Sequence, residues 1–216
     1  MASYKSLIEF NGKIGDLVFY QLNGKPVVRR KSGFNKEDYD KKESYKAVRQ
    51  NSSEFGHCSK VGKALREELK EYLKMVDDKY LYQKVARLMT RIKDQDLQNP
   101  KGSRKVSVGL SNPLGRKELA SFSFEGLKST EELFDISESL FDLSYSIKKT
   151  SKDLEIELTM LSIEDTGQVV IHSTSPINPE NNSRHISLDK PEKHPHAFGF
   201  YTMKTKGEIT GMGFIA

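Results

Sequence analysis

The residues that could perform nucleophilic catalysis are few in this 216-residue chain, and their spacing does not favour it. Cys58 is the single cysteine, which excludes an internal disulfide, and it follows His57 directly. Neighbouring residues on a helix point about 100° apart, so the imidazole of His57 cannot readily take the thiol proton of Cys58. The sequence has no G-x-S-x-G nucleophile elbow and no glycine-rich phosphate motif. We therefore predict a buried structural cysteine and no nucleotide hydrolysis.

Histidine and carboxylate pairs are the second set of candidates. His194 and His196 would share a face of an extended segment, but no cysteine or acidic cluster completes a metal site around them. Glu155 and Glu157 alternate with apolar residues, which is typical of the solvent-exposed face of a strand. The sequence therefore predicts a protein that is not an enzyme and that holds neither a metal nor another cofactor. A hydrolase without a recognised motif is the least supported alternative.

Positive charge is the strongest chemical feature of the sequence. Residues 1–104 carry 23 Lys and Arg against 14 Asp and Glu, whereas residues 105–216 carry 12 against 16. A basic half of this kind suggests an acidic or polyanionic partner, although lysines also solubilise exposed helices. The candidate partner-binding residues are two aromatic residues, a basic cluster shortly after them and a basic ridge on the first long helix: Phe19, Tyr20, Arg29, Arg30, Lys31, Lys60, Lys63 and Arg66.

The elements that would position these residues begin with a small sheet. Strand-like runs lie at residues 6–10, 14–22 and 26–31, separated by Asn11-Gly12 and Asn23-Gly24. Asn-Gly supplies the positive φ angles of a type I′ turn, whose twist matches that of hairpin strands. We therefore predict a three-stranded meander. Both of its faces are partly apolar, so we expect it to pack against another surface.

Between about residues 39 and 96 the chain has no proline and two glycines, which predicts helices. The first helix has one apolar stripe at a spacing of three to four residues: Phe55, Cys58, Gly62, Leu65, Leu69 and Tyr72, with Val61 and Leu73 at its margin. The second helix repeats the pattern with Leu81, Val85, Leu88 and Ile92. The short connection between them predicts an antiparallel hairpin, in which Leu65 and Leu69 pack against the second helix.

From residue 100 onward the pattern changes to short strand-like runs, and six of the seven prolines lie there. The expected strands are near residues 120–124, 141–147, 154–161, 168–173, 196–205 and 208–215, with a tight turn at Lys206-Gly207 and a long surface loop at 175–189. Spacing of this kind predicts an antiparallel β-sandwich or partial barrel. We expect an α+β protein with two domains, a meander and helical hairpin in residues 1–104 and an antiparallel β domain in residues 105–216.

Four motifs of the first half resemble a known family. They are Gly12-Lys-Ile-Gly15-Asp-Leu-Val-Phe19-Tyr20, Asn23-Gly24-Lys-Pro-Val-Val-Arg29, Arg49-Gln-Asn51-Ser-Ser-Glu54-Phe55-Gly56 and Ser59-Lys60-Val-Gly62-Lys63-Ala-Leu65-Arg66. Over roughly residues 10–95 the chain resembles a poorly characterised family of small Bacteroidota proteins, to which no catalytic residues are attached. Its length and the pattern of residues along it are similar to those of plug subunits, which close the periplasmic opening of the type IX secretion translocon. Some relatives look like phage or mobile-element proteins.

The resemblance implies a binding subunit that occludes or scaffolds a larger protein assembly, such as the outer-membrane barrel of that translocon. It also implies a periplasmic location, although the first ten residues offer only Leu7 and Ile8 before Glu9 and so predict no secretory signal. The alternative is a phage-related structural or nucleic-acid-binding protein that acts through the basic half and stays in the cytoplasm. No apolar run approaches the roughly 20 residues that cross a bilayer, so we expect no transmembrane segment.

Overall fold

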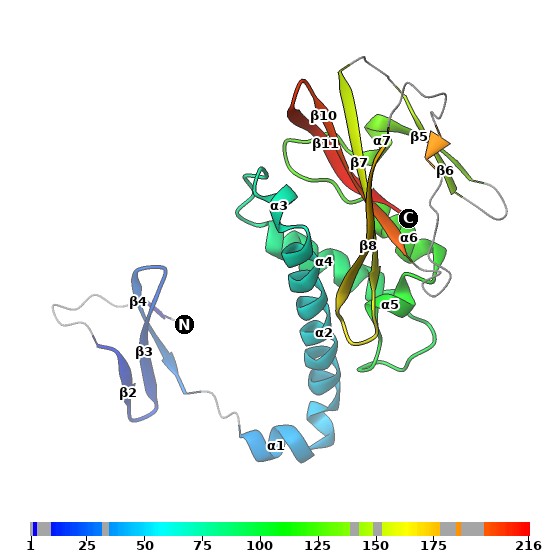
Figure 1. Cartoon of the computed structure of the whole chain (residues 1–216). Helices are drawn as coiled ribbons and strands as arrows, with labels where there is room; N and C mark the ends of the chain where they lie inside the picture. The colour runs from blue at the N-terminus through cyan, green and yellow to red at the C-terminus, as the bar shows by residue number, and fades with distance from the viewer. Residues whose placement is uncertain are drawn as a thin grey trace. The chain divides into compact units, whose positions relative to one another are not determined.

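The computed structural model describes residues 2–3, 10–31, 35–138, 143–148, 153–177, 185–186 and 197–216. The chain divides into two compact units, Met1–Lys46 and Ala47–Ala216. The first unit holds a small sheet and a short helix, and the second holds the long helices and two further sheets (Figure 1). Helices and antiparallel sheets together confirm the predicted α+β class. The boundary expected between residues 104 and 105 lies inside the second unit.

The sheet of the first unit is antiparallel and has the strand order β1-β4-β3-β2. Its strands are β1 (Ala2–Ser3), β2 (Gly12–Ile14), β3 (Leu17–Leu22) and β4 (Lys25–Arg30). Asn23 and Gly24 join β3 to β4 with φ angles of 52° and 74°, which confirms the predicted type I′ turn. Helix α1 (Lys36–Lys41) and a 3₁₀ turn at Glu43–Tyr45 follow the sheet.

The first turn of the meander lies elsewhere than predicted. Gly12 begins β2, and the chain reverses at residues 15 and 16, where Gly15 has a φ angle of 60° and Ile14 pairs with Leu17. Gly15 can take this left-handed conformation without a Cβ clash, so the long run expected at 14–22 is broken there. Of the strand expected at residues 6–10, residues 6–9 lie outside the described residues, and Phe10 lies in no strand.

The predicted pair of long helices is confirmed as α2 (Lys46–Glu68) and α4 (Leu81–Asp94), with the short α3 (Lys70–Leu73) between them. A Cβ atom on Gly62 would lie 3.3 Å from Val85 Cγ1, so α2 and α4 pack closely at this glycine. The buried stripe of α2 is rotated from the predicted one, because Phe55 is 65% exposed and Val61 is fully buried.

Three short helices after residue 100 were missed by the sequence patterns: α5 (Val106–Gly109), α6 (Pro113–Ala120) and α7 (Thr130–Leu133). The strand expected at residues 120–124 is wrong, because Ala120 ends α6 and residues 121–124 form no strand. Asn112 caps α6 by accepting a hydrogen bond from the backbone N–H of Leu114 at 3.0 Å. Gly109 lies against the carbonyl oxygen of Ile92, where any Cβ atom would overlap it, so α5 packs directly on the backbone of α4.

The main sheet of the second unit is antiparallel with the order β11-β10-β7-β8. Its strands are β7 (Leu154–Ile163), β8 (Val169–Ile177), β10 (Phe198–Thr205) and β11 (Glu208–Ile215), which confirms four of the predicted strands. Lys206 and Gly207 form the predicted turn with φ angles of 55° and 81°.

A second, three-stranded sheet in this unit has the order β5-β6-β9. It consists of β5 (Phe134–Glu138), β6 (Leu143–Ile147) and β9 (His185–Ile186). Strand β6 confirms most of the strand expected at residues 141–147, whose first two residues lie outside the described ones. Of the loop expected at 175–189, residues 175–177 belong to β8 and residues 185–186 to β9, and the remainder lies outside the described residues.

Both faces of strands β7, β10 and β11 in the main sheet are largely buried, whereas β8 is mostly exposed after its first residue. On one face, sheet residues and helix residues share a single apolar core that includes Cys58, Val61, Leu65, Leu69, Val85, Met89, Ile92, Leu161, Phe198, Phe200 and Phe214. On the other face, alternate sheet residues meet Phe134 and Ile147 of the smaller sheet, and the rings of Phe134 and Tyr201 lie 4.8 Å apart. Because α2 and α4 complete the core of the sheet, the two long helices and the β region form one unit. Among the described residues, no helix is long and apolar enough to cross a membrane.

Leu69 tests this shared core. It is 1% exposed, so Leu69→Ala removes buried apolar atoms and leaves a cavity, and we expect the free energy of unfolding to fall by about 2–5 kcal/mol. Leu97 is 84% exposed, and Leu97→Ala is the matched control, with an expected change within about 0.5 kcal/mol. Urea denaturation of the full chain measures both. Equal effects of the two substitutions would contradict the assigned core.

Candidate functional site

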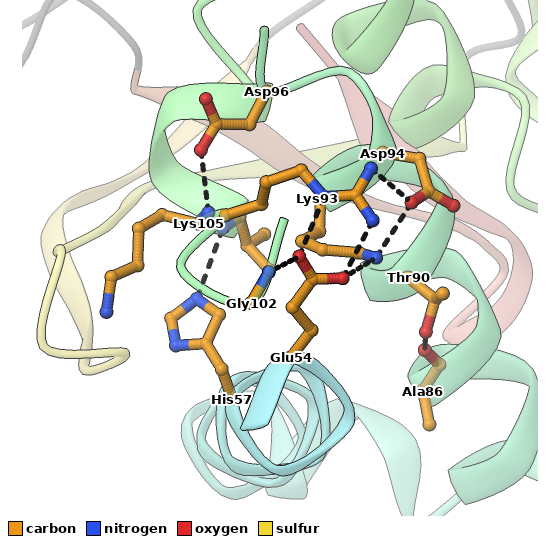
Figure 2. Close-up of polar contacts among 11 residues, drawn as sticks. Glu54, His57, Ala86, Thr90, Lys93, Asp94, Asp96, Gly102 and Lys105 are labelled. Carbon is orange, nitrogen blue, oxygen red and sulfur yellow. Dashed lines mark hydrogen bonds and ion pairs between the residues drawn. The ribbon is translucent and has the colours of Figure 1, made fainter. Parts of the chain in front are cut away.

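A cluster of paired charges around a buried carboxylate joins α2, α4 and the loop of residues 95–105 that follows α4. Its centre is the carboxylate of Glu54, which points from α2 toward Lys93 and Gly102 (Figure 2). The side chains of Glu54 and Lys93 are 4% and 6% exposed, and Lys93 Nζ donates to Glu54 Oε2 at 2.7 Å. Arg104 donates through Nε to Glu54 Oε1 at 2.8 Å and through Nη2 to Oε2 at 2.7 Å. This two-point contact fixes the guanidinium in the plane of the carboxylate.

Asp94 and Gly102 complete the cluster. Asp94 Oδ1 lies 2.7 Å from Lys93 Nζ and 3.1 Å from Arg104 Nη1, so one carboxylate bridges both cations. The backbone N–H of Gly102 donates to Glu54 Oε1 at 2.7 Å. Glu54 therefore accepts four hydrogen bonds, which compensate for its removal from water.

The cluster holds its charges at neutral pH. Hydrogen bonding from Arg104 sets the pKa of Glu54 well below its usual range; burial opposes this, and Lys93 and Gly102 reinforce it. Burial alone would lower the pKa of Lys93, but hydrogen bonds to Asp94 and Glu54 outweigh it and raise that pKa. The chemistry that these groups offer is therefore charge pairing and hydrogen-bond donation.

A second polar group organises the same loop. The buried carboxylate of Asp96 accepts hydrogen bonds from the backbone N–H groups of Gln98, Asn99 and Lys105 at 2.8–3.0 Å. The Asn99 amide donates to it as well, at 2.8 Å. These bonds fold the loop back, which brings Gly102 and Arg104 to Glu54.

His57 connects α2 to the start of α5. Its Nε2 accepts a hydrogen bond from the backbone N–H of Val106 at 3.1 Å, so the ring is neutral when this bond is made (Figure 2). Burial lowers the pKa of His57, and the positive charges of Lys105 and Lys60 lower it further, against an opposing effect of Asp165. One of the two ring nitrogens of His57, Nε2, is therefore engaged with the backbone of Val106 and does not face the Cys58 thiol as a proton acceptor.

An open hollow lies between α2, α4 and the 95–105 loop, with a volume of about 350 Å³. It is lined by one face of α2, one face of α4 and two residues of the loop: Asn51, Glu54, Phe55, Cys58, Thr90, Lys93, Asp94, Lys101 and Arg104. Cys58 is fully buried at its base, and burial raises the pKa of its thiol. Cys58 is therefore a packing residue here, as predicted.

The candidate residues of the first half lie in both units. Phe19 and Tyr20 are half-buried on β3 and point to opposite faces of the small sheet, as neighbours on a strand do. Arg30 pairs with Leu17 and so shares the face of Phe19, whereas Arg29 pairs with Val18 and shares the face of Tyr20. All three basic residues, including Lys31 beyond the end of β4, are exposed. The cluster expected at residues 29–31 is therefore divided between two faces.

The expected basic ridge on α2 is largely engaged by the protein itself. Lys60 Nζ donates to the carbonyl oxygen of Thr166 at 2.9 Å, and Lys63 Nζ lies 3.6 Å from Glu67 Oε1. Arg66 is half-buried and donates through Nε to the carbonyl oxygen of Gly62.

Sequence patterns missed the charge cluster, although one signal was present. Glu54 lies four residues before Cys58 on the apolar stripe of α2, so a charged residue stood where an apolar one was expected. Its partners Lys93 and Arg104 come from distant segments and had no such signal. Among the described residues, no group of three histidine, cysteine or acidic side chains could hold a metal ion. His194 and His196 lie outside those residues.

Glu54 provides a test of the cluster. Glu54→Ala leaves the buried Lys93 and the half-buried Arg104 with one remaining acid between them, and we expect a loss of about 3–5 kcal/mol in the free energy of unfolding. The control is Glu67→Ala, because the side chain of Glu67 is 64% exposed in its pair with Lys63 and should contribute at most about 0.5 kcal/mol. Denaturant melts measure both. A loss below about 1 kcal/mol for Glu54→Ala would mean that the two cations reach water without it.

His57 predicts a pH dependence of stability. The unfolded chain takes up a proton near the ordinary histidine pKa of 6.5, whereas the folded chain resists protonation of His57. Stability from this group is therefore complete above pH 6.5 and is lost as the pH falls toward the lowered folded-state pKa. In His57→Gln, an amide oxygen can accept the Val106 N–H without titrating. We expect thermal melts between pH 7 and pH 5 to show a smaller loss for this variant than for the natural chain, since all other titrating groups are shared. Parallel losses would contradict the role of His57.

Comparison of the chain with protein-family models, curated proteins and solved structures finds no match to any of them. The resemblance to the Bacteroidota family therefore stays a prediction that rests on the four sequence motifs.

Proposed function

We propose that the chain is a non-enzymatic binding subunit that occludes or scaffolds a larger protein assembly, and that the sheet of its first unit is the contact surface. The assembly that the sequence resemblance favours is the type IX secretion translocon, whose periplasmic opening such a subunit would close. A subunit of this kind works in the periplasm. The observation that carries the proposal is the exposed apolar and basic surface of the small sheet.

Apolar residues of this sheet remain exposed on the face that carries Phe19. Ile14 pairs with Leu17 and Phe19 with Val28, so these four side chains share that face. Ile14 and Leu17 are 57% and 43% exposed, and the ring of Phe10 lies 5.7 Å from that of Phe19. Exposed apolar groups beside an aromatic ring are typical of protein contact surfaces.

Charge favours an acidic partner for this face. Residues 10–31 contain five basic residues and one acidic residue, and Arg30 stands beside Leu17 on the apolar face. Arginine and aromatic residues are the most frequent anchors of protein interfaces. An apolar protein surface edged with acidic side chains, such as a pore rim, would match this combination in both hydrophobicity and charge.

The second candidate is nucleic-acid binding by a phage- or mobile-element-related protein. Exposed Arg29, Arg30 and Lys31 support it, because phosphate contacts need only accessible positive charge. The engagement of Lys60 and Lys63 in contacts within the chain weakens it.

Arg29 and Arg30 form a matched pair for the test, since they are adjacent, exposed and on opposite faces. Binding of the full chain to purified translocon barrel is measured with Arg30→Glu and with Arg29→Glu. We expect Arg30→Glu to weaken binding about tenfold or more, because it places an acid on the Phe19 face, and Arg29→Glu to have little effect.

Three outcomes would oppose this proposal. Absence of binding to the barrel by the natural chain would remove the translocon assignment. Equal weakening by both variants would show that net charge, and not the Phe19 face, determines binding. Binding to mixed oligonucleotides that falls steeply with salt would transfer support to the nucleic-acid alternative.

A further inference from the structure

The hollow beside the charge cluster belongs entirely to the second unit and is independent of the small sheet. Its interior groups are paired with one another, since Lys93 and Arg104 each contact both Glu54 and Asp94. These four residues balance in charge. Lys101 also lines the hollow and is exposed, and it pairs with no acidic group of the described chain. The hollow therefore carries one excess positive charge.

Hydrogen-bond donors in the hollow exceed the acceptors that they meet. Lysine has three N–H groups, and two acceptors face those of Lys93; arginine has five, and three of those of Arg104 are used. The exposed amide of Asn51 adds donors without a partner among the described residues. The four side chains that have unused donors thus all line one open space of about 350 Å³.

We infer that this hollow binds a small oxyanion, the shared chemistry of carboxylate, sulfate and phosphate ligands. The ammonium of Lys101 supplies the uncompensated charge, and Asn51, Lys93 and Arg104 supply further donors. Hydrogen bonds from charged donors to an oxyanion are the strongest that such a site can make. Phe55 lines the same hollow and is 65% exposed, so an apolar group attached to the anion has an aromatic surface to contact.

The negative charge of Asp94 opposes binding of an anion, so Asp94 provides a second, independent test of the inference. Its side chain is 46% exposed and shares Lys93 and Arg104 with the buried Glu54. A bound oxyanion competes with this carboxylate for the same cations and is repelled by it. Removing its charge should therefore strengthen anion binding, whereas removing Lys101 should weaken it.

Isothermal titration calorimetry on the full chain tests the inference with inorganic phosphate, sulfate, acetate and benzoate, at constant ionic strength set with chloride. We expect saturable binding with one site per chain. Benzoate should bind more tightly than acetate if Phe55 contacts the ligand, and phosphate or sulfate should exceed both if charge dominates. Lys101→Ala should weaken the preferred probe about tenfold. Asp94→Asn should strengthen it.

Lys79→Ala is the control, because Lys79 is also an exposed lysine in a turn but does not line the hollow. It should leave the dissociation constant unchanged, and thermal melts verify that each variant is folded. No saturable binding of any probe would overturn the inference. Equal dissociation constants for Lys101→Ala and Lys79→Ala, or weaker binding by folded Asp94→Asn, would also overturn it. Binding to the barrel is tested with residues of the small sheet, and anion binding is tested with residues of the second unit. Failure of one proposal therefore does not contradict the other.

Discussion

The second unit depends on the burial of one ionised carboxylate. Taking a carboxylate out of water is costly unless its hydrogen bonds are replaced, and Glu54 receives four replacements, from Lys93, Gly102 and Arg104. Three of these four hydrogen bonds are donated by Gly102 and Arg104, which lie in a loop that could otherwise adopt many conformations. Because Glu54 needs them, the loop must turn back toward α2, and Asp96 holds it in this course through its own backbone contacts. The ion cluster therefore determines where the chain goes after α4.

The course of that loop in turn places the short helices. Val106 follows directly after the loop, and its N–H reaches His57 on α2 before α5 packs on the backbone of α4 at Gly109. Apolar contacts alone would permit several registers between the helices and the sheet, since buried side chains of similar size can exchange places. The directional bonds of Glu54, Asp96 and His57 select one of them. Apolar burial supplies most of the stabilisation in this unit, and the polar groups supply its specificity.

Periodicity predicted the elements whose two sides differ in polarity. The alternation of Leu154, Ile156 and Leu158 identified β7, and the spacing of Val85, Leu88 and Ile92 identified α4. The short helices α5 and α6 were missed because four or eight residues are too few to show a helical period. The ion cluster was missed because Lys93 and Arg104 lie 39 and 50 positions after Glu54 in the sequence, and only the fold brings them to it. Charge counts over half the chain also concealed that Lys93 is buried, that Arg104 is half-buried, and that both are paired.

Part of the positive charge of the first half is engaged in contacts within the chain, and part is exposed. Lys60 and Lys63 are engaged on α2, whereas Arg29, Arg30 and Lys31 are exposed at the end of β4. Three or more strands with an apolar face are the least that makes a small sheet stable. In the described part of this sheet, Val27 is the one strand residue of known exposure that is buried. Exposed apolar residues and exposed positive charge thus occur together on the described strands of this sheet. A partner that covers the Phe19 face would contact both, which is why we place the proposed contact surface on this sheet and not on the helices.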